Sequence, residues 1–166
     1  MRNLVAAPVI ILAVIMQSAI VSRIYLLSGI ADLPLVMLAA WALQDEVNTA
    51  WQWAIATGLL VGFVSGIAWF VPVISYLIVV ILAQFLQRRV WQAPLLAMFI
   101  ITFLGTIVLY LFSFATLRLS GVPLSVSDTL GLLTLPGVLL NMLLAIPAYA
   151  VMRDLSRWAN PSSEVE

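Results

Sequence analysis

The chain has 166 residues, of which 64% are hydrophobic and 8% are charged, and its formal net charge is zero. Soluble domains are about half apolar and about a quarter charged, so this composition indicates a membrane protein instead. The balanced charge also excludes the basic surface of a nucleic-acid-binding protein.

Cysteine, histidine and lysine are all missing from the sequence. Their absence removes disulfides, thiolate nucleophiles, imidazole bases and the usual ligands of zinc, copper and haem. We therefore expect neither a metal nor a cofactor.

The first hydrophobic segment is expected to form a helix over residues 4–25. Its mostly apolar part, residues 4–21, is about 27 Å long as a helix, which nearly matches the hydrocarbon thickness of a bilayer. An A-x-A-like cleavage site does not follow it, so we interpret it as a retained helix and not as a signal peptide.

The second segment, residues 30–44, is the weakest, because it is short and has Asp32 and Pro34 at its start. It is expected either to cross at a tilt or to cross only partly. Four further helices are predicted at residues 51–71, 73–87, 94–117 and 129–152. Pro72 is expected to end the third helix, and Pro136 and Pro147 lie inside the last.

These segments predict an all-α fold, a compact bundle of about six transmembrane helices. Residues 1–157 are expected to form this single domain, and residues 158–166 a disordered cytoplasmic tail. The longest loop, residues 118–128, is rich in turn-forming residues.

The arginines predict the orientation in the membrane. With six crossings, Arg23 and Arg118 fall on one side, and the other side receives Arg2, Arg88, Arg89, Arg153 and Arg157. The positive-inside rule then places both termini in the cytoplasm. Tryptophans are expected at the inner interface at 51, 53, 91 and 158, and at the outer one at 69. A five-crossing arrangement, with Arg2 outside, fits the rule less well.

Small residues recur every four positions in the third helix, at Ala50, Ala54, Gly58, Gly62 and Gly66. Such a stripe lets another backbone approach closely in lipid. Two interpretations stay open: packing within the bundle, or a docking face for another chain.

The last helix places Gly137, Asn141, Ala145 and Tyr149 on one face, with Pro136 and Pro147 beside them. Each proline leaves a carbonyl four residues earlier without its helical donor, so that carbonyl needs another partner. Asn141 is expected to point inward and to hydrogen-bond across helices. The helix at 94–117 carries hydroxyls at 102, 106, 110 and 113, expected to bond to their own or a neighbouring helix.

Catalytic chemistry is not predicted. No ionisable residue is expected clearly at the midplane, where pumps and intramembrane hydrolases need one. The paired carboxylates Asp45 and Glu46 are adjacent and point about 100° apart on a helix, so they do not form an acid/base pair. We expect a protein that is not an enzyme.

Three stretches together resemble MreD, the membrane subunit of the bacterial rod-shape elongation machinery (the elongasome). They are Ala31-Asp-Leu-Pro-Leu-Val36, Gly58-Leu-Leu-Val-Gly-Phe-Val-Ser-Gly66, and the segment 135–149 with Pro136, Asn141, Pro147 and Tyr149. Two positions depart from the family pattern. The family often has an acidic residue where this chain has Trp69-Phe70, and basic residues where it has Asp45-Glu46.

The resemblance implies a non-catalytic scaffold for peptidoglycan synthesis in the bacterial inner membrane. The implied partner is MreC, and through it the RodA glycosyltransferase, its partner transpeptidase and MreB; a homodimer is also open. The rival interpretation is the substrate-binding subunit of an energy-coupling-factor vitamin transporter, also a six-helix bundle of this size and one whose fold MreD is expected to share. Its helix 1 docking motifs are matched here only by Ser18-x-x-x-Ser22.

Overall fold

The computed structural model describes residues 2–44, 49–89 and 93–159, with the backbone alone at residues 2–7, 22, 25 and 159. Three features of the sequence lie outside these residues: the Asp45-Glu46 turn, Trp91, and positions 160–166 of the expected tail.

The first half of the chain contains the helices α1 (Arg2–Ala19), α2 (Leu33–Ala42) and α3 (Ala50–Ser65). Between α1 and α2 lie a 3₁₀ turn (Val21–Arg23) and a two-residue antiparallel pair, β1 (Tyr25–Leu26) and β2 (Gly29–Ile30). The second half contains α4 (Phe70–Arg89), α5 (Pro94–Leu119) and one continuous helix made of α6 (Val126–Asp128), a π-helical segment (Thr129–Thr134) and α7 (Leu135–Ala159).

The first helix is shorter than predicted. It ends at Ala19 and not near residue 25, and the chain then folds back through the β1–β2 hairpin into the bundle. The second helix starts at Leu33, where Asp32 forms the N-cap: its Oδ1 accepts a hydrogen bond from the Leu35 amide at 2.9 Å. Pro34 fits here because the first helical turn does not need its amide.

The prediction that Pro72 ends the third helix is wrong, because this proline also lies in the first turn of a helix. The third helix already ends at Ser65, followed by Gly66 in the left-handed region at φ 68°. Pro72 lies in the first turn of α4, where a missing amide hydrogen costs little. Proline therefore marks the start of a helix here, and the glycine marks the end of the preceding one.

The last helix is longer than predicted and runs unbroken from Val126 to Ala159. The π-helical segment directly precedes Leu135 and Pro136. Within it, Thr134 Oγ1 donates a hydrogen bond to the Thr129 carbonyl at 3.0 Å. The helix includes Trp158 and Ala159, the first two residues of the expected disordered tail.

Three helices are long and apolar enough to cross a membrane: Phe70–Arg89, Pro94–Leu119 and Val126–Trp158. The helix α2 has 10 residues, about 15 Å, which is about half of a bilayer's hydrocarbon thickness. The chain is thus a helical bundle, in which α2 is too short to span a membrane by itself.

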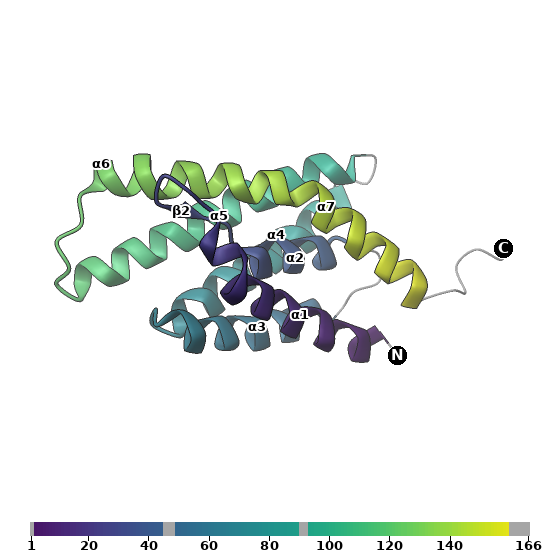
Figure 1. Cartoon of the computed structure of the whole chain (residues 1–166). Helices are drawn as coiled ribbons and strands as arrows, with labels where there is room; N and C mark the ends of the chain where they lie inside the picture. Colours follow the sequence, from purple (N-terminus) through teal and green to yellow (C-terminus); the bar gives the residue numbers. More distant parts are fainter. Residues whose placement is uncertain (1, 45–48, 90–92, 160–166) are drawn as a thin grey trace.

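The helices lie roughly along one direction (Figure 1). The start of α1 and the end of α7 lie at the same end of the bundle, which we call the terminal end. At the opposite end, the turn between α5 and α6 extends beyond the turn between α3 and α4.

The helix α2 forms the centre of the bundle. All its residues except Leu33 and Met37 are buried, and it packs against α1, α4, α5 and α7. A helix that is hydrophobic all round has no face that favours water, so its sequence is compatible with this burial. The fully buried side chains of the bundle's core include Leu35 and Leu38 of α2, Tyr76 of α4, and Met98 and Ile101 of α5.

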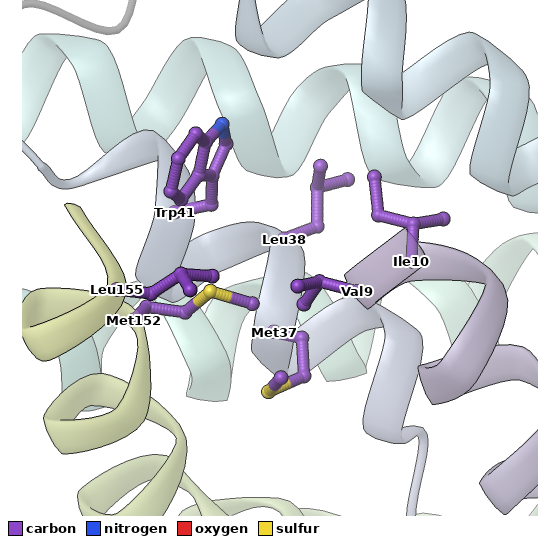
Figure 2. A pocket seen from close by; sticks show the side chains of 7 residues that line it. All are labelled: Val9, Ile10, Met37, Leu38, Trp41, Met152 and Leu155. Atoms are coloured by element: carbon purple, nitrogen blue, oxygen red, sulfur yellow. The ribbon is translucent and has the colours of Figure 1, made fainter. Parts of the chain in front are cut away.

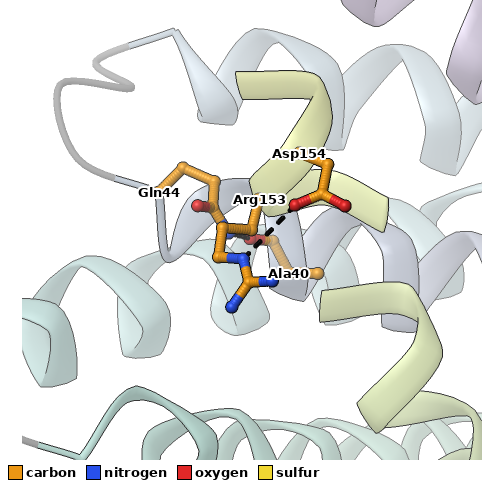
Figure 3. Close-up of polar contacts among 4 residues, drawn as sticks. All are labelled: Ala40, Gln44, Arg153 and Asp154. Atoms are coloured by element: carbon orange, nitrogen blue, oxygen red, sulfur yellow. Dashed lines mark hydrogen bonds and ion pairs between the residues drawn. The ribbon is translucent and has the colours of Figure 1, made fainter. Parts of the chain in front are cut away.

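Near the terminal end, α1, α2 and α7 meet around an apolar cluster (Figure 2). A void of about 10 Å³ remains between Ile10, Trp41, Met152 and their neighbours, which is about the space of one water molecule. Polar contacts there are local (Figure 3): Gln44 Nε2 donates to the Ala40 carbonyl at 2.9 Å, and Arg153 pairs with Asp154 at 3.4 Å on the exposed surface.

Candidate functional site

The polar centre of the molecule surrounds residues 30–33, which we call the entry segment, where the chain enters α2 inside the bundle. The carboxylate of Asp32 accepts two kinds of hydrogen bond there. The Leu35 amide donates to Oδ1 at 2.9 Å, and the hydroxyl of the fully buried Tyr76 lies 2.9 Å from both Oδ1 and Oδ2. Asp32 therefore caps α2 and joins it to α4.

Asn141 joins the entry segment to two further helices. Its Oδ1 accepts from the Asp32 amide at 2.7 Å, and its Nδ2 donates to Thr106 Oγ1 at 2.9 Å. Thr106 in turn donates to the Thr102 carbonyl at 2.6 Å. The side chain of Asn141 is fully buried. The expectation that Asn141 points inward and bonds across helices is confirmed.

Two more helices donate side chains to the backbone of the entry segment. Gln17 of α1 donates from Nε2 to the Ala31 carbonyl at 2.8 Å and accepts at Oε1 from the Leu33 amide at 2.9 Å. Tyr110 of α5 donates to the Ile30 carbonyl at 3.2 Å. Non-helical backbone inside a bundle is costly unless its polar groups are paired, and these side chains pair them.

Pro136 has the consequence that its sequence position predicts. The carbonyl four residues earlier, that of Leu132, accepts a hydrogen bond from the Ser28 amide at 3.0 Å. The hairpin also packs directly on this part of the helix: a Cβ on Gly29 would lie 2.6 Å from the Gly137 nitrogen and 2.8 Å from Pro136 Cβ. A Cβ on Gly137 would collide with the Tyr110 ring and hydroxyl.

The remaining predicted residues of the last helix lie outside this centre. Ala145 is fully buried in the apolar core, and Tyr149 packs against that core while half-buried. Pro147 lies within α7 and is exposed. The face predicted from Gly137 to Tyr149 therefore points inward along its length, and Asn141 in its first half joins the hydrogen-bond network.

The small-residue stripe of α3 packs within the chain. Ala50, Ala54, Gly58 and Gly62 are buried. A Cβ on Gly58 would lie 2.6 Å from Val73 Cα, and one on Gly62 would lie 2.7 Å from Trp69 Cα. Gly66 is exposed and ends the helix. The stripe is thus occupied by α4 and its preceding loop, which is the first of the two interpretations.

The position of Asp32 was not predicted from the sequence. No ionisable residue was expected clearly at the bilayer midplane, and the structure places this carboxylate inside the bundle, among α2, α4 and α7. A signal for it was present, because an aspartate followed two residues later by a proline is an N-cap pattern. In the structure Tyr76 and Asn141 bond to Asp32 itself, whereas Gln17 and Tyr110 bond to the backbone of its neighbours.

A cavity of about 370 Å³ opens beside Asp32, and we call it the Asp32 cavity. Its wall comes from the hairpin and entry segment, the end of α3, the start of α4, α5 and the π-helical segment. It is mostly apolar, with Val61, Pro72, Leu109, Phe114 and Leu133 among its lining residues.

The network ties α1, α2, α4, α5 and α7 together, and it has the properties of a structural joint. Within the described residues no group of three acidic side chains could hold a metal ion.

No family of known proteins, no curated protein sequence and no solved structure matches this chain.

Proposed function

We propose that this protein is a non-catalytic membrane scaffold of the bacterial cell-wall elongation machinery, which binds an MreC-like protein and helps to maintain rod shape. One observation carries the proposal. Two stretches of the MreD resemblance, around Asp32 and Asn141, contain residues that are 109 positions apart and bond directly to each other at 2.7 Å. Residues that the resemblance groups together are therefore one joint of the bundle.

The outer surface supplies faces for a partner helix. Large apolar side chains are exposed on several helices, for example Phe63 of α3 (80% exposed), Ile81 of α4 (63%) and Leu143 of α7 (71%). Lipid covers such faces in a monomer, and a single-span partner replaces lipid on one of them. Since α4 already covers the glycine stripe of α3, the partner uses one of these outer faces.

The proposed membrane arrangement follows from the same geometry. The five arginines at 2, 88, 89, 153 and 157 belong to chain segments at the terminal end, and Arg23 and Arg118 belong to segments at the other end. In the positive-inside rule the terminal end faces the cytoplasm. MreC's external domain then lies on the side of the α5–α6 turn, with RodA, its transpeptidase and MreB as indirect partners.

Site-specific photo-cross-linking tests this proposal. A photoreactive amino acid is placed singly at Phe63, Ile81 or Leu143, and the chain is expressed with an MreC-like protein from the same host. Cross-linking from one face, with the other two as controls, supports docking and identifies the helix. Absence of cross-links from all three, together with normal rods after depletion of the protein, contradicts the scaffold proposal.

The Asp32 cavity is the observation that favours the rival function, a vitamin-binding transporter subunit. A ligand that binds only the folded state raises the unfolding temperature by mass action. A thermal-shift screen of the purified protein against water-soluble vitamins separates the two. Saturable stabilisation by one vitamin would favour the transporter subunit over the scaffold.

A further inference from the structure

The Asp32 cavity carries an inference beyond the scaffold function and independent of it. Its volume of about 370 Å³ lies within the range of small-molecule sites, about 300–1,000 Å³. Such sites combine an apolar wall with a few converging polar groups. Here the polar groups belong to Gln17, Ser28, Asp32 and Tyr110, and all four line the cavity.

This wall is rich in hydrogen-bond acceptors. The donor groups of Gln17 and Tyr110 are directed at the backbone carbonyls of Ala31 and Ile30. The Asp32 carboxylate accepts from Leu35 and Tyr76, but an ionised carboxylate has about four acceptor sites. Asp32 is partly exposed and is one of the residues that line the cavity.

The charge of Asp32 also lacks a cation. In the part of the chain that the structure describes, the one ion pair joins Arg153 and Asp154, and it lies at the terminal end. A carboxylate inside a bundle is expensive, and an ionisable residue there is by default a functional candidate. A positively charged group in the cavity would neutralise it.

We propose that the Asp32 cavity binds an organic ammonium compound, with the ammonium group on the Asp32 carboxylate and an apolar body against Leu109, Phe114 and Leu133. The apolar lining selects an organic cation over a hydrated metal ion, because Val61, Pro72 and the other apolar side chains cannot replace a metal's water ligands. The ammonium group comes from a soluble amine or from the head group of an aminophospholipid.

The first experiment compares octylamine with 1-octanol, which has the same chain without the charge. Both are titrated into the purified full-length protein in a non-ionic detergent, and binding is followed by thermal shift. The amine should stabilise the protein saturably and more than the alcohol. In Asp32→Asn the N-cap and the acceptor for Leu35 are kept, but the charge is removed. The affinity for the amine should fall about 10- to 100-fold, with that for the alcohol unchanged.

A second pair of variants keeps the test valid if Asp32→Asn folds poorly. Ser113→Leu fills the cavity from α5, and Ala115→Leu adds the same side chain at an exposed position of α5. Ser113→Leu should abolish stabilisation by the amine, and Ala115→Leu should preserve it.

The source of the ammonium group is tested by native mass spectrometry of protein extracted from vesicles of phosphatidylethanolamine or of phosphatidylglycerol. Retention of phosphatidylethanolamine, reduced by Ser113→Leu, identifies the lipid head group. Stabilisation by octylamine without lipid retention identifies a soluble amine. Equal effects of octylamine and 1-octanol, or an unchanged amine response in both Asp32→Asn and Ser113→Leu, would overturn the proposal.

Discussion

Asn141 is the residue on which the most separate parts of the chain depend. Its Oδ1 accepts a hydrogen bond from the Asp32 amide in the entry segment, and its Nδ2 donates one to the Thr106 hydroxyl of α5. Buried polar groups that lose their partner cost about 1–3 kcal/mol each, more than an intact hydrogen bond contributes. The sequence predicted the inward direction of Asn141, but not that a backbone amide 109 positions away is its partner.

Replacement of Asn141 by alanine should therefore lower the free energy of unfolding by about 1–3 kcal/mol, because the Asp32 amide loses its acceptor. The measurement is thermal or denaturant unfolding in detergent. Leu139→Ala in the same helix is the control. Leu139 is 55% exposed, so this substitution removes no core contact. Equal stability of the two variants would contradict the assigned role of Asn141.

Two tyrosines of the network provide a matched comparison. Tyr76 is fully buried and donates to the Asp32 carboxylate at 2.9 Å, whereas Tyr110 is half-buried and donates to a carbonyl at 3.2 Å. Hydrogen bonds to charged acceptors are stronger than neutral ones. Tyr76→Phe should cost about 1.5–3 kcal/mol and Tyr110→Phe about 0.5–1.5 kcal/mol in the same unfolding assay. The reverse order would contradict the assignment of Asp32 as the central acceptor.

Among the elements of the fold, the hairpin between α1 and α2 is notable because it packs against the last helix. Its backbone touches the last helix at Pro136 and Gly137, where only glycine fits at position 29. The turn also holds Leu27 at φ 57°, a left-handed conformation that is uncommon for residues other than glycine. The contacts with α7 and the π-helical segment hold this turn in place.

Gly29→Ala should destabilise the protein by about 1–3 kcal/mol or more, because its Cβ would meet backbone atoms that cannot move aside. Gly131→Ala is the matched control, since a Cβ there meets nothing within 4 Å and alanine favours helix. We expect Gly131→Ala to be neutral or slightly stabilising. The unfolding midpoints of the two variants are the measurement, and a neutral Gly29→Ala would exclude the close approach to α7.

The glycine stripe of α3 changes how one substitution is interpreted. A leucine at Gly62 would collide with the backbone of Trp69 and open the contact between α3 and the start of α4. Loss of a partner in Gly62→Leu would then report a damaged bundle and not a lost docking face. Substitutions at exposed residues such as Phe63 avoid this ambiguity.

At the scale of the whole molecule, the helices give the bundle two distinct ends. Ser127 lies beside the α5–α6 turn, and Asp154 lies near the end of α7, so one continuous helix separates them. That helix, Val126–Trp158, is long enough to cross a membrane. Both side chains are exposed.

Cysteine labelling tests the orientation, and the natural chain has no cysteine to interfere. Ser127→Cys should react in intact spheroplasts with a membrane-impermeant thiol reagent. Asp154→Cys should react only after permeabilisation, because the terminal end is expected in the cytoplasm. Labelling of both from the same side would contradict a crossing by this helix.

The amino-acid sequence was sufficient to predict a helical membrane protein. Long apolar runs are sufficient for α4, α5 and the last helix, because hydrophobic length is a local property. It also determined that Asn141 faces inward and that the Leu132 carbonyl needs a donor, since the chemistry of one residue requires both.

The places where the polar groups meet depend on how the helices pack. Gln17, Tyr76, Tyr110 and Asn141 come from four different helices, and they converge on the entry segment around Asp32. A short segment such as α2 is stable as half a helix only because these side chains satisfy the backbone before it. The sequence around Asp32 contains an N-cap pattern, but which side chains meet there depends on the packing of helices that are distant in the chain.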